Sequence, residues 1–186
     1  MLCNRYLRIF VEGPSDKDLF EKKLKSVINK HFKASRFCIE FIEYKSLSRF
    51  GAEEINRILI MSRKYGDKVI FTGDCAESHC ITEAKDKLKK TYTEINNYPI
   101  FIVKQEIESW YLAGLDKRAQ KELGLEYYSD TDKIKRSRFK KMVPDEESYS
   151  VFLNKILPRF KLAVASKQNS SFKYFIDHLC KKRLFT

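Results

Sequence analysis

Acidic side chains follow three short apolar runs of the sequence, each close to the point where the run ends. Glu12 and Asp16 lie in RIFVEGPSDKDLF, and Asp74 follows KVIFTG. Glu106 and Glu108 follow the third run, YPIFIV, within KQEIESW. Carboxylate oxygens are the ligands that Mg²⁺ and Mn²⁺ prefer, and these ions commonly bind substrate phosphate as well. The acidic residues therefore predict a divalent-metal site that acts on phosphate groups.

The elements that must position these residues alternate between strands and helices. Runs of β-branched and aromatic residues predict strands over 6–11, 37–44, 68–72 and 98–103. Apolar residues at helical spacing predict helices after each strand, the first with a capping box formed by Ser15 and Asp18. This alternation favours a parallel sheet with right-handed crossovers. Because the carboxyl ends of parallel strands share one edge, the acidic residues should converge there.

Each acidic residue also has a simpler interpretation. Glu12 and Asp16 could stabilise the positive end of a helix dipole, and Asp74 could cap the next segment. Glu77, three residues after Asp74, is either a further ligand or a surface acid. Glu106 and Glu108 stand two positions apart in a predicted helix over 106–115, so they should not share a face.

The second part of the chain is predicted to be helical and basic. Asp116, Asp145 and Ser170 are placed to cap helices that end near residues 123, 157 and 183. We therefore expect an α/β domain over 1–115 and a helical extension over 116–186 that packs on it. Residues 117–186 hold 17 basic and 8 acidic side chains, so they carry +9 of the net charge of +12.

This charge asymmetry favours nucleic acid as the partner, although an ordinary solvated surface would also explain it. The segment KIKRSRFKK interleaves cations with two apolar residues and is the best candidate for phosphate contacts. The cations expected to contact nucleic acid there are Lys133, Lys135, Arg136, Arg138, Lys140 and Lys141. Tyr127 and Tyr128 could stack on unpaired bases, or simply pack against the protein.

Other classes of protein are less compatible with the sequence. No apolar run reaches the roughly 20 residues that span a bilayer, and no secretory signal is visible, so no membrane partner is expected. The five scattered cysteines predict free thiols and a cytoplasmic location. Cys75, His79 and Cys80 lack the second ligand pair of a structural zinc site. No nucleotide-binding glycine motif is present.

The ordered motifs resemble the TOPRIM domain of topoisomerases, bacterial primases and nucleases of the overcoming-lysogenization-defect type. EGPSD after the first strand is similar to the family's E-G-x-x-[DE] turn, and Asp74 in TGDC matches the second aspartate of its Asp-x-Asp strand end. KQEIESWYLA resembles the E-x-W-x-x-A segment of small prokaryotic TOPRIM-like proteins, which points to Glu108. SSFKYF at 170–175 is similar to their tails.

The resemblance implies a Rossmann-like TOPRIM core, with a mainly parallel sheet of about four strands. It also implies a Mg²⁺- or Mn²⁺-dependent nuclease that hydrolyses DNA or RNA phosphodiester bonds. Glu12, Asp16 and Asp74 would hold the metal, with Glu77 as a further ligand, and Glu108 would complete the catalytic group. Lys104 would offset charge on the phosphate.

One departure from the family pattern concerns catalysis. Thr72 stands where the first aspartate of Asp-x-Asp is expected, and threonine is a weaker, neutral ligand. Glu77 could compensate for the lost carboxylate. The alternative is a degenerate TOPRIM protein that binds nucleic acid without cutting it.

Overall fold

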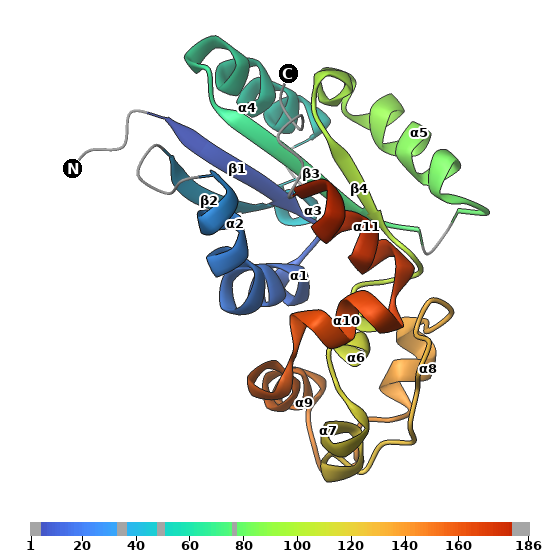
Figure 1. The fold of residues 1–186 in the computed structure, drawn as a ribbon. Coiled ribbons are helices and arrows are strands. Elements are labelled where there is room, and N and C mark those ends of the chain that lie inside the picture. Colours follow the sequence, from blue (N-terminus) through green and yellow to red (C-terminus); the bar gives the residue numbers. More distant parts are fainter. Residues whose placement is uncertain (1–4, 33–36, 48–50, 76–77, 180–186) are drawn as a thin grey trace.

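The computed structural model describes residues 5–32, 37–47, 51–75 and 78–179, and a four-stranded parallel sheet lies at its centre (Figure 1). The strands are β1 (Tyr6–Val11), β2 (Cys38–Glu43), β3 (Lys68–Asp74) and β4 (Ile100–Val103), in the order β2-β1-β3-β4. Each neighbouring pair is parallel. The predicted α/β class with about four parallel strands is confirmed, and the sheet with its flanking helices is consistent with a Rossmann-like fold.

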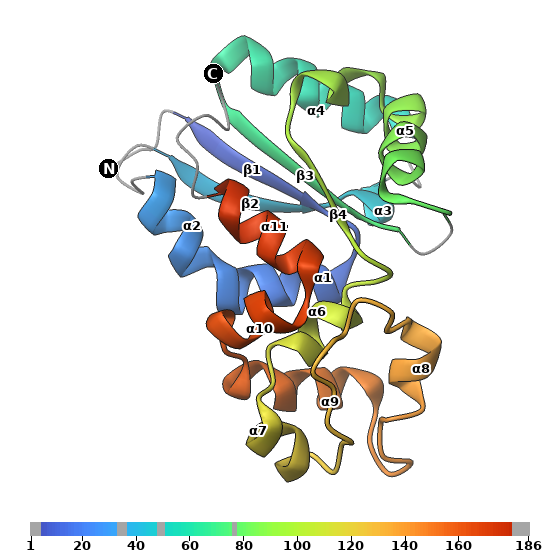
Figure 2. The same cartoon turned by 45° about the vertical axis from the view of Figure 1, so that its right-hand side comes forward.

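Helices cover both faces of the sheet. One face carries α4 (Ala52–Tyr65) and α5 (Ile81–Thr91), and the other carries α1 (Pro14–Leu19), α2 (Lys25–Phe32) and α11 (Ser170–Leu179), as Figures 1 and 2 show. A π-helical turn, η1 (Phe20–Leu24), joins α1 to α2, and the 3-10 helix η3 (Thr93–Asn97) follows α5. The short helix α3 (Tyr44–Leu47) follows β2 directly.

The remaining helices extend the molecule beyond the carboxyl ends of the strands (Figure 2). They are α6 (Glu108–Ala113), α7 (Lys117–Glu122), α8 (Arg136–Lys140), α9 (Tyr149–Ile156), the 3-10 helix η4 (Leu157–Arg159) and α10 (Leu162–Gln168). This segment therefore faces the edge of the sheet at which the sequence places the acidic residues.

The alternating side chains of β1 enter two separate cores. Leu7, Ile9 and Val11 belong to the larger hydrophobic cluster, whereas Phe10 belongs to the cluster beneath α4 and α5. This alternation is the expected result for a strand buried on both faces. The larger cluster also includes Phe175 of α11, so side chains from both sides of residue 115 share one core.

Three predicted helix caps differ from the structure, and one is confirmed. Asp116 accepts a hydrogen bond from the Ala119 N–H at 2.9 Å and caps α7 as predicted. Asp145 does not cap α9, because that helix begins later and uses the Ser148 hydroxyl. The capping box at Ser15 is also wrong, since α1 already begins at Pro14. Proline is favoured at the first helical position because its fixed φ suits the helix and its missing N–H needs no partner there.

The final helix is capped by Asn169 rather than by the predicted Ser170. Asn169 Oδ1 accepts hydrogen bonds from the Phe172 N–H at 3.0 Å and from the Ser171 hydroxyl at 2.7 Å, and its Nδ2 donates to Thr131 Oγ1 at 3.1 Å. Ser171 Oγ in turn accepts from the Trp110 indole N–H at 2.8 Å. The segment that resembled a family tail thus holds α11 against α6.

The cysteines only partly follow the expectation of free thiols. Cys75 and Cys80 are free, but Cys38 is disulfide-bonded. Cys3 and Cys180 lie outside the described residues. Spacing along the chain did not reveal this bond. Within the described ranges, every helix is too short or too polar to cross a membrane.

We predict that Asn169→Ala lowers the free energy of unfolding by about 2 kcal/mol, because it removes a helix cap and leaves buried hydrogen-bonding groups unpaired. Chemical denaturation monitored by circular dichroism measures this loss. The control is Asn97→Ala, since Asn97 is exposed. Equal stability of the two variants would contradict the capping role.

Candidate functional site

The carboxyl ends of β1 and β3 meet at the place where α/β folds usually bind ligands. The chain leaves β1 toward β2 on one side, whereas it leaves β3 toward β4 on the other side. Such a reversal opens a crevice beyond the strand ends. Glu12 follows β1 and Asp74 ends β3, and the Asp74 N–H donates to Glu12 Oε2 at 3.2 Å. The structure therefore brings together the two acids that the sequence placed at this edge.

Glu12 receives further hydrogen bonds from the segment that follows β2. The Tyr44 hydroxyl donates to Glu12 Oε2 at 3.3 Å, and the Lys45 ammonium forms an ion pair with Oε1. Sequence reasoning missed both residues. The strand pattern could have indicated Tyr44 and Lys45, because they follow β2, whose carboxyl end lies at this same edge with Glu43 paired to Val11.

Asp16 lies in the first turn of α1 and is only 4% exposed. Burial raises its pKa to about 7, and the negative charges of Glu12 and Glu108 act in the same direction. Hydrogen bonds from the backbone of its own turn oppose the shift without cancelling it. At neutral pH, Asp16 therefore sits close to the midpoint between its protonated and ionised forms.

Asp74 has a similar environment. Burial holds its pKa well above the usual range, and the charges of Asp16, Glu12 and Glu108 add to the shift, while Arg136 opposes it. Its Oδ1 atom is buried and has no hydrogen-bond partner among the described residues. The mutual effects on pKa show that these acids occupy one electrostatic site.

Glu108 is fully buried on α6 and binds two side chains from the helical extension. Its Oε1 atom accepts hydrogen bonds from Arg136 Nε at 2.7 Å and from the Tyr149 hydroxyl. Its Oε2 atom is buried and unpartnered within the described part of the chain. Burial raises the pKa of Tyr149, and the hydrogen bond to Glu108 raises it further. Glu108 thus connects the acidic edge to α8 and α9.

The expectation that Glu106 and Glu108 diverge is wrong. Glu106 precedes α6 rather than belonging to it, and its Oε2 atom accepts from the Arg136 backbone N–H at 2.6 Å. Gln105, just before it, has a φ of 66°, which turns the chain between β4 and α6. Both glutamates therefore converge on Arg136, because the helical spacing rule does not apply outside the helix.

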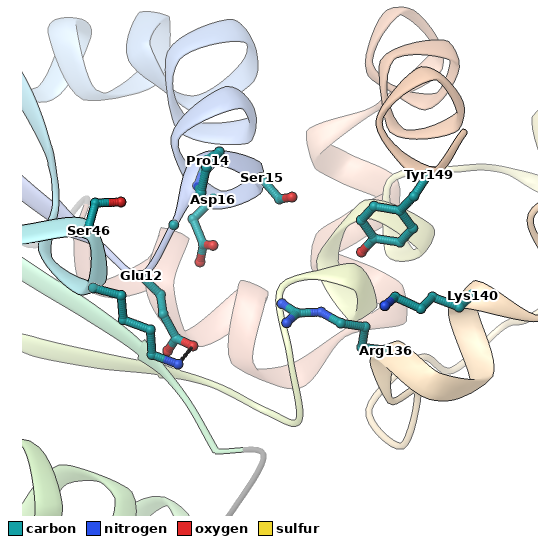
Figure 3. A pocket seen from close by; sticks show the side chains of 10 residues that line it. Glu12, Pro14, Ser15, Asp16, Ser46, Arg136, Lys140 and Tyr149 are labelled. Carbon is teal, nitrogen blue, oxygen red and sulfur yellow. Dashed lines mark hydrogen bonds and ion pairs between the residues drawn. The ribbon is translucent and has the colours of Figure 1, made fainter. Parts of the chain in front are cut away.

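A cavity of about 490 Å³ separates the acidic edge from the helical extension. Figure 3 shows Glu12 and Asp16 on one side, with Arg136, Lys140 and Tyr149 on the other. The residues that line it are Glu12, Gly13, Pro14, Ser15, Asp16, Lys45, Ser46, Arg136, Lys140 and Tyr149. The cavity therefore has an anionic wall and a cationic wall that face each other.

Two other residues predicted for the site, Lys104 and Thr72, lie outside the cavity lining. Lys104 forms an ion pair with Asp132 at 2.9 Å and does not line the cavity. Thr72 is buried, and its hydroxyl donates to the Phe10 carbonyl at 2.9 Å, so it is engaged within the sheet. Glu77 lies outside the described residues.

The predicted basic segment divides into an inner and an outer set. Ile134 and Phe139 are buried and anchor the segment to the protein. Arg136 and Lys140 line the cavity. The cations of this segment that are exposed and lie outside the cavity lining are Lys133, Lys135, Arg138 and Lys141.

The donor set fits Mg²⁺ or Mn²⁺, the metals implied by the family resemblance. The available atoms are hard carboxylate oxygens, and Asp74 Oδ1 is buried without a hydrogen-bond partner among the described residues. Those residues contain no group of three or more His, Cys, Asp or Glu side chains arranged to hold a metal. Mg²⁺, however, commonly takes only one or two protein carboxylates and completes its shell with water and phosphate.

Comparison of the chain with known protein families, with curated proteins and with solved structures found no match. The function is therefore inferred from the cavity and its two walls.

We predict that Asp16→Asn stabilises the protein above about pH 7 and has little effect near pH 4. The raised pKa means that the folded state holds the proton more tightly than the unfolded chain does. Stability of the wild type should therefore fall as pH rises through this window, by up to a few kcal/mol at about 1.4 kcal/mol per pKa unit. Urea unfolding at several pH values measures the difference.

Asp18→Asn is the matched control, because Asp18 lies on the same helix but is 43% exposed and pairs with Lys22 at 3.2 Å. It should give no gain that grows with pH. A gain for Asp16→Asn that is the same at pH 4 and pH 8 would contradict the raised pKa.

Proposed function

We propose that the protein is a Mg²⁺- or Mn²⁺-dependent nuclease of the TOPRIM type, which hydrolyses phosphodiester bonds of DNA or RNA. The observation that carries this proposal is the junction of Glu12 and Asp74 at the reversal of the sheet, next to a cavity whose opposite wall is cationic. A metal ion at the anionic wall would balance the negative charge of the carboxylates. A phosphate near the cationic wall would balance the positive charge of Arg136 and Lys140.

The carboxylates would have distinct roles in such a reaction. Glu12 and Asp74 are the residues that would hold the metal, with Asp16 beside them. A divalent ion there would neutralise charge on the phosphate and lower the pKa of water. Asp16, buried in the first turn of α1 beside these residues, would be the group that accepts a proton from the attacking water.

A second function is favoured by the contacts of Lys45 and Thr72. The Lys45 ammonium already pairs with Glu12, and Thr72 uses its hydroxyl within the sheet. Both features reduce the number of oxygens free to coordinate a metal. The alternative is therefore a nucleic-acid-binding protein with a degenerate TOPRIM site, for which binding should weaken steeply with salt and no cleavage should occur with either metal.

The test is cleavage of end-labelled single- and double-stranded DNA and RNA by purified protein, with Mg²⁺, Mn²⁺ or EDTA. We predict metal-dependent cleavage that Glu12→Gln and Asp74→Asn each reduce by about 100-fold or more, since each removes a charged metal ligand.

Glu43→Gln serves as the control, because Glu43 also ends a strand at this edge but its carboxylate forms an ion pair with Lys17 at 3.3 Å. It should retain activity within a few-fold of the wild type. Undiminished cleavage by Glu12→Gln or Asp74→Asn would contradict the site. Binding without cleavage under all metal conditions would favour the alternative.

A further inference from the structure

Arg136 is held in one orientation by two acidic residues. Its Nε atom lies 2.7 Å from Glu108 Oε1, and its backbone N–H donates to Glu106 Oε2 at 2.6 Å. These carboxylates, Glu108 first, keep the pKa of Arg136 above its usual value although burial opposes the charge. Its guanidinium is therefore a fixed, permanent cation at the cavity.

The end of this guanidinium points into the cavity. Among the described residues, Glu106 and Glu108 both approach Nε rather than the two Nη nitrogens, and the Tyr149 hydroxyl also hydrogen-bonds with the Arg136 side chain. The side chain is 42% exposed, and Figure 3 shows it directed toward Glu12 and Asp16. The planar guanidinium can donate two parallel hydrogen bonds to two oxygens of one phosphate group.

Lys140 adds a second cation on the same wall. It lies one helical turn after Arg136 on α8, and its ammonium is 5.8 Å from the centre of the Tyr149 ring. Both cations line the cavity together with the hydroxyls of Ser15 and Ser46. A tetrahedral anion between the walls would thus meet donors on several sides.

We propose that Arg136 and Lys140 bind a phosphate group of the substrate on the wall opposite the carboxylates, and that Glu108 orients Arg136 for this contact. Glu108 is then a positioning residue rather than a catalytic one, because it is fully buried and reaches the cavity through Arg136 and Tyr149. The choice of nucleic acid as ligand rests on the proposed function.

Equilibrium binding of a fluorescent 12-nucleotide single strand in EDTA tests this subsite without cleavage. Arg136→Gln should weaken binding by about 10- to 100-fold, the range for a hydrogen-bonded charge pair. It should also reduce the slope of log Kd against log salt concentration by about 0.7, the value for one lost contact with a single strand. Arg136→Lys should keep the slope but lose affinity several-fold, since it retains the charge without the planar fork.

The control variant is Arg57→Gln, which removes the same charge from an exposed position on α4 that pairs with Glu54. It should change affinity by less than about two-fold, because single exposed charges contribute little. An equal effect of Arg57→Gln and Arg136→Gln would overturn the subsite and leave only general attraction between the basic protein and the strand.

The role of Glu108 is tested by a double-mutant cycle. Glu108→Gln keeps the shape of the side chain and should weaken binding several-fold in the wild type but not in Arg136→Gln. Additive effects, in proteins shown to be folded by their melting curves, would overturn the positioning role. A nucleoside monophosphate used as competitor distinguishes the source of the phosphate: strong competition indicates a terminal phosphate, and weak competition indicates one within the chain.

This experiment separates the two proposals. Loss of binding in Arg136→Gln, together with no metal-dependent cleavage by the wild type, would support the subsite and exclude the nuclease. Cleavage that is lost in Asp74→Asn, together with binding that is unchanged in Arg136→Gln, would support the nuclease and exclude the subsite.

Discussion

The repulsion between four buried or partly buried carboxylates is the constraint on which the rest of the site depends. Glu12, Asp16, Asp74 and Glu108 each raise the pKa of at least one of the others or of a neighbouring tyrosine. A fold does not keep such a group together without compensation. Here the compensation is partial: Lys45 pairs with Glu12 and Arg136 pairs with Glu108, while one oxygen of Asp74 has no partner among the residues that the structure describes. The raised pKa values of Asp16 and Asp74 mean that bound protons relieve part of the remaining repulsion, and a bound cation would displace these protons.

The sequence predicted the part of the site that depends on strand order. Apolar runs that end in acids are visible directly, and parallel pairing places their ends on one edge, so Glu12 and Asp74 were found from local patterns. The caps at Asp145 and Ser170 were misplaced because serine, aspartate and asparagine close together offer several equivalent starts, and the packing of each helix selects one. The cap at Ser15 was misplaced because Pro14 already starts α1.

The cationic wall was harder to predict. The sequence of the basic segment KIKRSRFKK does not distinguish one cation from another. In the fold, burial of Ile134 and Phe139 anchors the segment so that Arg136 and Lys140 line the cavity. Tyr149 lies 41 residues from Glu108, in a region without strands whose register could bring them together. Residues of this kind meet through tertiary packing, which no local periodicity encodes.

The most direct test of this account is calorimetric titration of the wild type and Asp74→Asn with Mn²⁺ at neutral pH. The account predicts saturable binding to the wild type, accompanied by proton release because Asp16 and Asp74 must ionise. It also predicts loss of that binding in Asp74→Asn. Binding without proton release, or equal binding to both proteins, would contradict the carboxylate site.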